Sequence, residues 1–219
     1  NGNTDTVPTE GNTTVITGTN GTLTVNADGS YSYKANANTG GEADSFKFEI
    51  TDKDGDKAEA TIGITINAAT GPEATTKVTV DEKGLFDSTD NSEIAEVTVT
   101  GYTVVDGGNG TYGNVSFVDG KWVYALTDTF THTGTGADTK VDADTVTIKV
   151  KDAQGNTFNV DVKVDIKDAV PTIKASDNLT AVSGNDSTTT GTLSYNFGAD
   201  GAGSLTVNGN TYTVPTEGN

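Results

Sequence analysis

One stretch of this chain occurs twice, at a constant separation of 100 residues. The first copy, DSFKFEITDKDGDKAEATIGITI, spans residues 44–66, and the second, DTVTIKVKDAQGNTFNVDVKVDI, spans residues 144–166. Identical residues coincide at several positions, namely Asp44 with Asp144, Asp52 with Asp152 and Gly55 with Gly155. Self-similarity at a fixed period is the signature of repeated folding units. We therefore expect two homologous units, each containing a long strand–turn–strand hairpin.

Apolar and polar residues alternate within these copies. In SFKFEI the residues Phe46, Phe48 and Ile50 share one face, and ATIGITI places three isoleucines in the same way. Alternation with a period of two is typical of a strand with one buried and one solvated face. Helical spacing is sustained nowhere, and turn dipeptides such as Asp28-Gly29 separate the runs. The sequence therefore predicts an all-β chain built as β-sandwiches.

The repeat also sets the expected domain boundaries. Upstream of the hairpin, GTLTVNADGSYSYK (21–34) is similar to GNVSFVDGKWVYAL (113–126), and the second unit carries an insertion around FTHTGTGADTK. We expect residues 70–168 to form a complete β-sandwich. Residues 1–69 would be the back half of a sandwich, and residues 169–219 the front half of the next one.

The chain begins and ends on nearly the same phrase. NGNTDTVPTEGN at 1–12 returns as NGNTYTVPTEGN at 208–219, with Asp5 against Tyr212 as the one difference. We expect the chain to be one period of a tandem array, 207 residues from residue 1 to residue 208, cut inside a domain. The expected partners are neighbouring repeats of the same protein. Half-domains of different molecules would also pair head to tail, because each exposes unpaired strand edges.

The chain is strongly acidic. Its formal net charge is −18, and all 13 basic residues are lysines. Nucleic acids and anionic membrane surfaces would be repelled, and no apolar run approaches the roughly 18 residues of a membrane span. The natural partners of so many carboxylates are cations, and the alternative is that acidity only keeps an extracellular protein soluble. Because Cys is absent, disulfides, zinc–thiolate sites and a cysteine nucleophile are excluded.

One hairpin turn, TDKDGD, concentrates three carboxylates: Asp52, Asp54 and Asp56. Oxygen ligands clustered so closely suit Ca²⁺, which takes six to eight of them. The spacing resembles the start of an EF-hand loop, but no helix flanks it and no Glu follows at the twelfth position. The alternative is a tight turn in which Asp and Gly serve only the backbone.

Further candidate calcium ligands lie at strand ends and in the linker. Asp44 should lie at the opposite end of the sandwich from Asp52, because eight residues of strand span roughly 26 Å. Asp144 and Asp152 repeat this arrangement, and Asp168 lies in the exit linker before Pro171. Carboxylates from a hairpin tip, a linker and the next domain would converge on one ion and order the linker.

Catalysis has little support in the sequence. His132 is the only histidine and lies in the insertion FTHTGTG, where we expect a surface loop. Without a second His, a Cys or a paired base, a nucleophilic triad has no basis. The acidic residues map to turns and linkers, so a hydrolase with paired carboxylates is a weak alternative. We expect that the chain is not an enzyme.

The stretch DGSYSYKA followed by ADSFKFEITDKDGDKAEATIGITI resembles the immunoglobulin-like repeats of RTX adhesins, giant type I-secreted surface proteins of Gram-negative bacteria. The KDAVPTI linker is similar to the inter-domain junctions of that family, and related hairpins occur in cadherin-like repeats. The resemblance implies tandem immunoglobulin-like (cadherin-like) β-sandwich domains, extracellular on the bacterial cell surface. Their role would be a calcium-stiffened extender that projects a distal ligand-binding region for adhesion and biofilm formation. One departure is KDAQGN in the second unit, where an acidic TDKDGD is expected. The alternative function is a carbohydrate- or protein-ligand-binding module.

Overall fold

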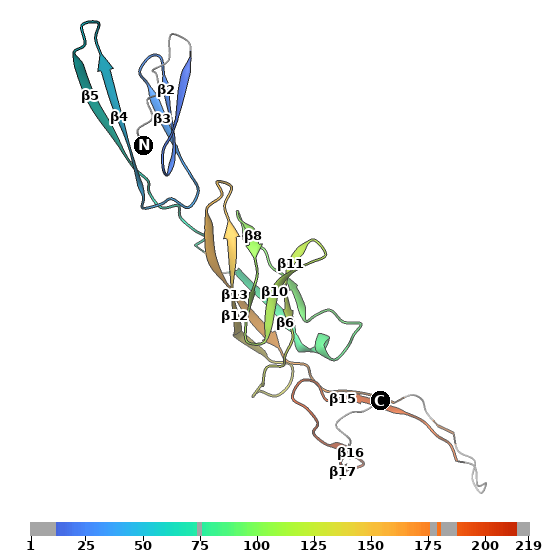
Figure 1. The fold of residues 1–219 in the computed structure, drawn as a ribbon. Helices are drawn as coiled ribbons and strands as arrows, with labels where there is room; N and C mark the ends of the chain where they lie inside the picture. Colours follow the sequence, from blue (N-terminus) through green and yellow to red (C-terminus); the bar gives the residue numbers. More distant parts are fainter. Residues whose placement is uncertain (1–11, 74–75, 176–178, 181–187, 214–219) are drawn as a thin grey trace. The chain divides into compact units, whose positions relative to one another are not determined.

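The computed structural model describes residues 12–73, 76–175, 179–180 and 188–213. The chain separates into two compact units. Unit 1 comprises Asn1–Gly71 with Lys151–Phe158, and unit 2 comprises Pro72–Val150 with Asn159–Asn219. Within the described ranges nearly every element is a strand, and the one helix is a 3-10 turn, η1 (Glu82–Leu85) (Figure 1). The predicted all-β class is confirmed, whereas the boundaries at residues 69 and 168 stay predictions.

Unit 1 contains two antiparallel sheets. A three-stranded sheet has the order β1 (Thr13–Thr17), β2 (Gly21–Asn26), β3 (Tyr31–Ala35), and a long hairpin joins β4 (Ala43–Thr51) to β5 (Lys57–Thr65). Their inward side chains meet in a small core of Leu23, Val25 and Phe46. Ile16, Tyr33, Phe48 and Ile64 pack against this core.

The alternation in β4 was expected to bury Ile50, and this prediction is wrong. Ile50 is 69% exposed, although Phe46 on the same face is buried. The core of unit 1 covers the part of β4 around Phe46. Ile50 lies near the turn, opposite Ala58 of β5, beyond the reach of that cluster. The alternation therefore identified which face of β4 is directed to the core. It did not show how far along the strand the core extends.

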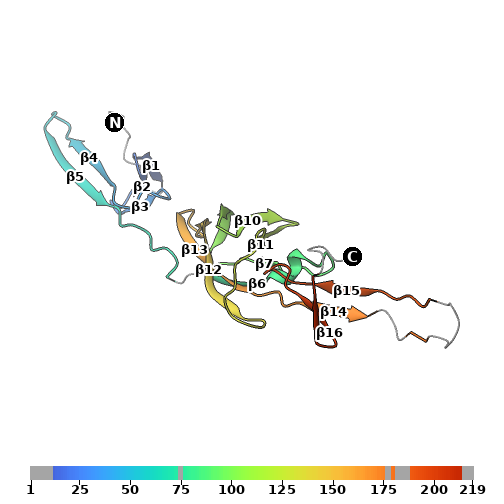
Figure 2. The ribbon, with the colours of Figure 1, turned by 90° about the horizontal axis from the view of Figure 1, so that it is seen from below.

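Unit 2 contains two four-stranded sheets (Figures 1 and 2). One has the order β7 (Ile94–Glu96), β11 (Lys121–Leu126), β10 (Gly113–Val118), β9 (Gly108–Asn109). The other has the order β6 (Thr76–Asp81), β13 (Thr157–Lys167), β12 (Thr139–Lys151), β8 (Thr103–Asp106). β6 and β13 run parallel, with Val80 opposite Ile166. Fully buried side chains from both sheets form the core, among them Val80, Tyr124, Val146, Ile148, Val162, Val164 and Ile166.

The C-terminal part of unit 2 forms two small hairpins. β14 (Thr172–Ala175) pairs with β15 (Leu193–Asn196), and β16 (Leu205–Val207) pairs with β17 (Asn210–Tyr212). Four of their large apolar side chains are exposed: Ile173, Leu193, Val207 and Tyr212. Among the described residues, none fully covers these four side chains. No helix in the described part of the chain is long and apolar enough to cross a membrane.

Candidate metal centres

Asp44 lies buried on β4 and is held by donors from the three-stranded sheet. Its carboxylate accepts hydrogen bonds from the backbone N–H groups of Thr19 (3.1 Å) and Asn20 (3.0 Å). The hydroxyl of Tyr33 donates to Oδ2 at 2.6 Å. We call this arrangement, a carboxylate held by two loop N–H groups and one tyrosine hydroxyl, the aspartate clamp.

The aspartate clamp recurs in unit 2 around Asp144. The N–H groups of Thr111 and Tyr112 donate at 2.8 and 3.0 Å, and the hydroxyl of Tyr124 donates at 2.8 Å. The N–H of Thr145 adds a fourth hydrogen bond at 2.8 Å. The sequence repeat is therefore also a repeat of one hydrogen-bonded constellation.

Glycines make room for both clamps. A Cβ atom at Gly18 or at Gly110 would collide with Oδ2 of the clamp aspartate, and a Cβ at Gly21 or Gly113 would collide with the clamp tyrosine. The four positions correspond in pairs, because Gly21 opens β2 and Gly113 opens β10. The repeated glycines are thus explained by close approach and not by turn conformation.

The hydrogen bonds keep both clamp carboxylates charged. The Tyr33 hydroxyl and the two loop N–H groups lower the pKa of Asp44 against the opposing effect of burial. Burial acts to raise the pKa of Asp144, but its four donors outweigh that effect and the net shift is downward. Burial and the neighbouring Asp44 raise the pKa of Tyr33 to about 12. The protein itself supplies donors to these oxygens, and a metal role for Asp44 and Asp144 stays a prediction.

The TDKDGD turn brings Asp52, Asp54 and Asp56 together at an exposed tip. Each offers a carboxylate oxygen, and these oxygens lie within 4.8 Å of one another. Asp52 Oδ1 also accepts hydrogen bonds from the N–H groups of Gly55 (3.0 Å) and Asp56 (2.8 Å). These bonds shape the turn, and all three residues are exposed at its tip. The arrangement suits an oxygen-binding cation such as Ca²⁺.

Asp152, at the corresponding turn, has a structural role. Its Oδ1 accepts hydrogen bonds from the N–H groups of Gln154 (2.9 Å) and Asn156 (2.8 Å). Its Oδ2 accepts one from the Asn156 side chain at 2.8 Å. Asn156 therefore occupies one oxygen of Asp152, whereas the corresponding position of the TDKDGD turn is a carboxylate, Asp56. The calcium role of Asp152 stays a prediction.

Asp168 belongs to a buried cluster with Glu82 and His132, which we call the buried triad. One side-chain atom from each residue lies within 4.8 Å of the others. The expectation that His132 lies on the surface is wrong, because its side chain is only 1% exposed. Its ring packs edge-to-face on Phe130 at 5.1 Å, and Phe130 packs edge-to-face on Tyr112 at 5.3 Å, a contact that links the insertion to the sandwich.

Glu82 and Asp168 reach the buried triad by continuing two strand patterns. Glu82 follows the inward positions Val78 and Val80 of β6, and Asp168 follows Val164 and Ile166 of β13. The parallel register places Lys167 opposite Asp81, so the next residues, Asp168 and Glu82, are neighbours. The alternation of Val78, Val80 and Glu82 was a usable signal in the sequence for an inward-facing Glu82, a residue that was not among the predicted site residues.

The carboxyl groups of the buried triad have few partners that would stabilise a negative charge. Burial is the main cause that raises the pKa of Glu82. Burial also raises the pKa of Asp168, and the negative charge of Asp200 adds to the effect. Atoms of the triad without a hydrogen-bond partner are Glu82 Oε2, both ring nitrogens of His132 and Asp168 Oδ1.

The comparisons with known proteins bear on unit 1. No curated protein matches the chain at a significant level. Residues 1–68 match the family model of the bacterial cadherin-like domain. Domains of this type are typically structural or adhesive and generally bind calcium. The all-β structure with several sheets agrees with that match, which indicates an immunoglobulin-like extracellular repeat module.

Proposed function

We propose that this chain is an extender segment of a giant bacterial surface adhesin of the RTX type. Its tandem immunoglobulin-like sandwiches would carry a distal ligand-binding region away from the cell for adhesion and biofilm formation. The observation that carries the proposal is the aspartate clamp, which recurs with the same donor types around Asp44 and Asp144. A repeated stabilising device suits modules that share one mechanical task in series.

An extender and a ligand-binding module differ in what they bind. We expect the chain to show no specific binding on a glycan array, because its task is to connect other domains. In single-molecule stretching it should unfold in discrete events, one for each sandwich. Saturable binding to one glycan class, abolished by a single surface substitution, would contradict the extender and favour the ligand-binding alternative.

We propose calcium as the cation of this extender and place its site at the TDKDGD tip. The support is the convergence of Asp52, Asp54 and Asp56 within 4.8 Å. Extracellular modules bind Ca²⁺ with dissociation constants of roughly 10⁻⁴–10⁻³ M. Binding there would remove the mutual repulsion of three carboxylates. In the full protein, neighbouring repeats would supply further ligands.

Calcium should raise the thermal midpoint of the chain. At ten times the dissociation constant, one site adds about 1.4 kcal/mol to the free energy of unfolding. Calorimetry of the chelator-treated chain with added Ca²⁺ measures this shift. The double variant Asp54→Asn/Asp56→Asn should lose it, because both substitutions remove carboxylates while Asp52 still shapes the turn.

The control for this experiment is Asp119→Asn. Asp119 precedes Gly120 in an exposed turn with φ of 49°, a conformation that Asn adopts as readily. This variant removes a charge without touching the TDKDGD tip, so the calcium shift should remain. An equal loss of the shift in both variants would show that calcium acts through overall charge.

A further inference from the structure

The buried triad lies in unit 2 where three segments meet. Glu82 opens η1 directly after β6, Asp168 directly follows β13, and His132 belongs to the segment that joins β11 to β12. Two backbone contacts tie that segment to the other two. Phe130 N–H donates to Glu82 Oε1 at 2.6 Å, and Asp168 N–H donates to the carbonyl of Asp138 at 2.9 Å.

Each ring nitrogen of His132 faces a carboxylate without forming a hydrogen bond. Nε2 lies 3.4 Å from Glu82 Oε2, and Nδ1 lies 3.1 Å from Asp138 Oδ1. Asp168 Oδ1 also lacks a partner. Carboxylates removed from water without a cation cost several kcal/mol each. The triad therefore presents electron pairs from two carboxylates and one imidazole to a shared space.

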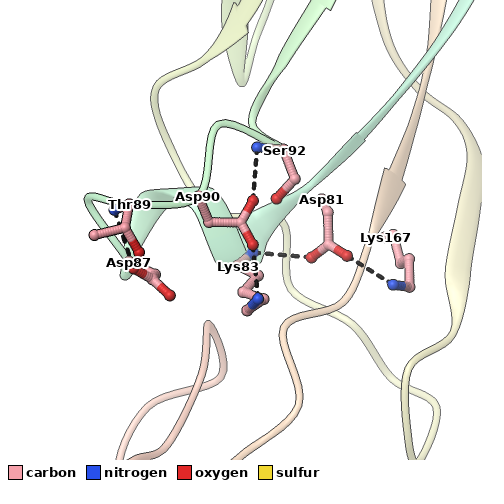
Figure 3. A network of polar contacts seen from close by, with 7 residues as sticks. All are labelled: Asp81, Lys83, Asp87, Thr89, Asp90, Ser92 and Lys167. Carbon is pink, nitrogen blue, oxygen red and sulfur yellow. Dashed lines mark hydrogen bonds and ion pairs between the residues drawn. The ribbon is translucent and has the colours of Figure 1, made fainter.

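The lysines beside the triad do not neutralise it. Lys83 follows Glu82 in the sequence, but its Nζ pairs with Asp90 at 2.6 Å. Lys167 precedes Asp168, but its Nζ pairs with Asp81 at 2.7 Å. Figure 3 shows this network, in which Asp81 also accepts the N–H of Lys83. Both ammonium groups are thus held by partly buried carboxylates, one at the end of β6 and one in the loop between η1 and β7.

We propose that the buried triad binds one transition-metal dication of the zinc class through Glu82 Oε2, His132 Nε2 and Asp168 Oδ1. Imidazole suits Zn²⁺ and its neighbours, whereas Ca²⁺ and Mg²⁺ take oxygen ligands. The 3.4 Å between Nε2 and Oε2 equals the separation of two ligands that each lie about 2.0–2.1 Å from a tetrahedral zinc.

Asp138 completes this proposed site as a positioning residue. A metal-bound histidine commonly directs its other ring nitrogen to a carboxylate, which fixes the ring and its tautomer. Asp138 Oδ1 is placed for that role at 3.1 Å from Nδ1. Its side chain is 42% exposed, so this edge of the cluster gives a cation access from solvent.

This set of residues belongs to unit 2 and has no full counterpart in unit 1. The residue 100 positions before Asp168 is Ala68, and the insertion that carries His132 has no counterpart in unit 1. The proposed zinc-class site is therefore not part of the common repeat. It is also independent of the calcium site at the TDKDGD tip, which contains only oxygen ligands.

Cobalt and zinc titrations of the full chain, purified without a histidine tag, test the proposal. We expect one Co²⁺ per chain, with a visible absorption spectrum that shows nitrogen and oxygen ligands. Zn²⁺ should displace the cobalt, and millimolar Ca²⁺ should not. Because His132 is the only histidine of the chain, a nitrogen ligand in that spectrum identifies its imidazole.

Substitutions test which residues bind the metal. His132→Gln should abolish the cobalt spectrum, and Asp138→Asn should weaken zinc binding about 10–100-fold. Asp54→Asn/Asp56→Asn is the matched control and should bind Co²⁺ and Zn²⁺ as tightly as the unsubstituted chain does. The nitrogen NMR signals of His132 in the unsubstituted chain give a reading that does not depend on variants folding. A doubly protonated ring that persists with excess zinc would overturn the proposal, as would cobalt binding that Ca²⁺ reverses.

Discussion

Asn in place of Asp144 should lower the stability of unit 2 by about 3 kcal/mol, because it dismantles one aspartate clamp. Hydrogen bonds to a charged group contribute about 1.5–3 kcal/mol each, and an unsatisfied buried donor costs about 1–3 kcal/mol. The carboxylate accepts four hydrogen bonds. An amide oxygen cannot replace both carboxylate oxygens, and the amide NH₂ would face an N–H group.

Calorimetry should therefore show the transition of unit 2 lowered by at least about 10 °C. Tyr124→Phe removes only one donor, so its cost should be about 1–2 kcal/mol. In the double variant the two losses should be less than additive, because the same hydrogen bond is counted in each. Asp119→Asn, in its exposed turn, is the charge-matched control. If Asp144→Asn unfolds at the same temperature as Asp119→Asn, the clamp does not stabilise the sandwich.

The clamp also predicts how stability depends on pH. The folded pKa of Asp144 lies below its usual value of 3.8, because four donors outweigh the effect of burial. A lowered folded pKa stabilises the protein at pH values above the unfolded pKa, and this contribution is lost as pH falls through the folded value. The stability difference between the unsubstituted chain and Asp144→Asn should consequently narrow below about pH 4.

The strands could be predicted from the sequence because their signal is local. Alternation identified the β4–β5 and β12–β13 hairpins, and the spacing in TDKDGD brought its three carboxylates to one turn. The role of Asp44 could not be predicted in the same way. Its backbone donors lie 24 and 25 residues away, and their approach depends on how two sheets pack.

His132 shows a different limit of sequence reasoning. A lone histidine in a Gly- and Thr-rich segment is typical of a surface loop, yet its ring is buried against Phe130. Its neighbours Glu82 and Asp168 directly follow β6 and β13. The inward-facing positions of these two strands could be identified from the alternation in the sequence. What the sequence lacks is the parallel pairing of β6 with β13, which makes those two ends neighbours.

Association of the chain with itself is the other large expected effect. In unit 2, β13 lies between β12 and β6. In unit 1 the equivalent strand, β5, has one hydrogen-bonded neighbour among the described strands, β4. An unpaired strand edge is a template for another chain. The offset of 100 places Ile62, Ile64 and Ile66 where Val162, Val164 and Ile166 pair with β6.

We propose β14 of a second molecule as the partner of that edge. β14 begins directly after Pro171, and β6 begins a few residues after Pro72, so both are first strands that follow a proline. Ile173 on β14 is 61% exposed and is the apolar side chain that β5 would cover. Each molecule carries one β5 edge and one β14, and such a head-to-tail contact does not close.

Sedimentation and light scattering should therefore show a mass that grows with concentration, without a limiting dimer. Ile173→Lys should return the chain to a monomer, because a lysine at a pairing edge opposes strand addition. Val118→Lys is the matched control, since Val118 is an exposed apolar residue on β10 of unit 2 and lies outside the proposed contact. Association that survives Ile173→Lys but not Val118→Lys would move the contact from β14 to β10. A chain that stays monomeric at every concentration would show that the β5 edge is not a docking site for a second copy.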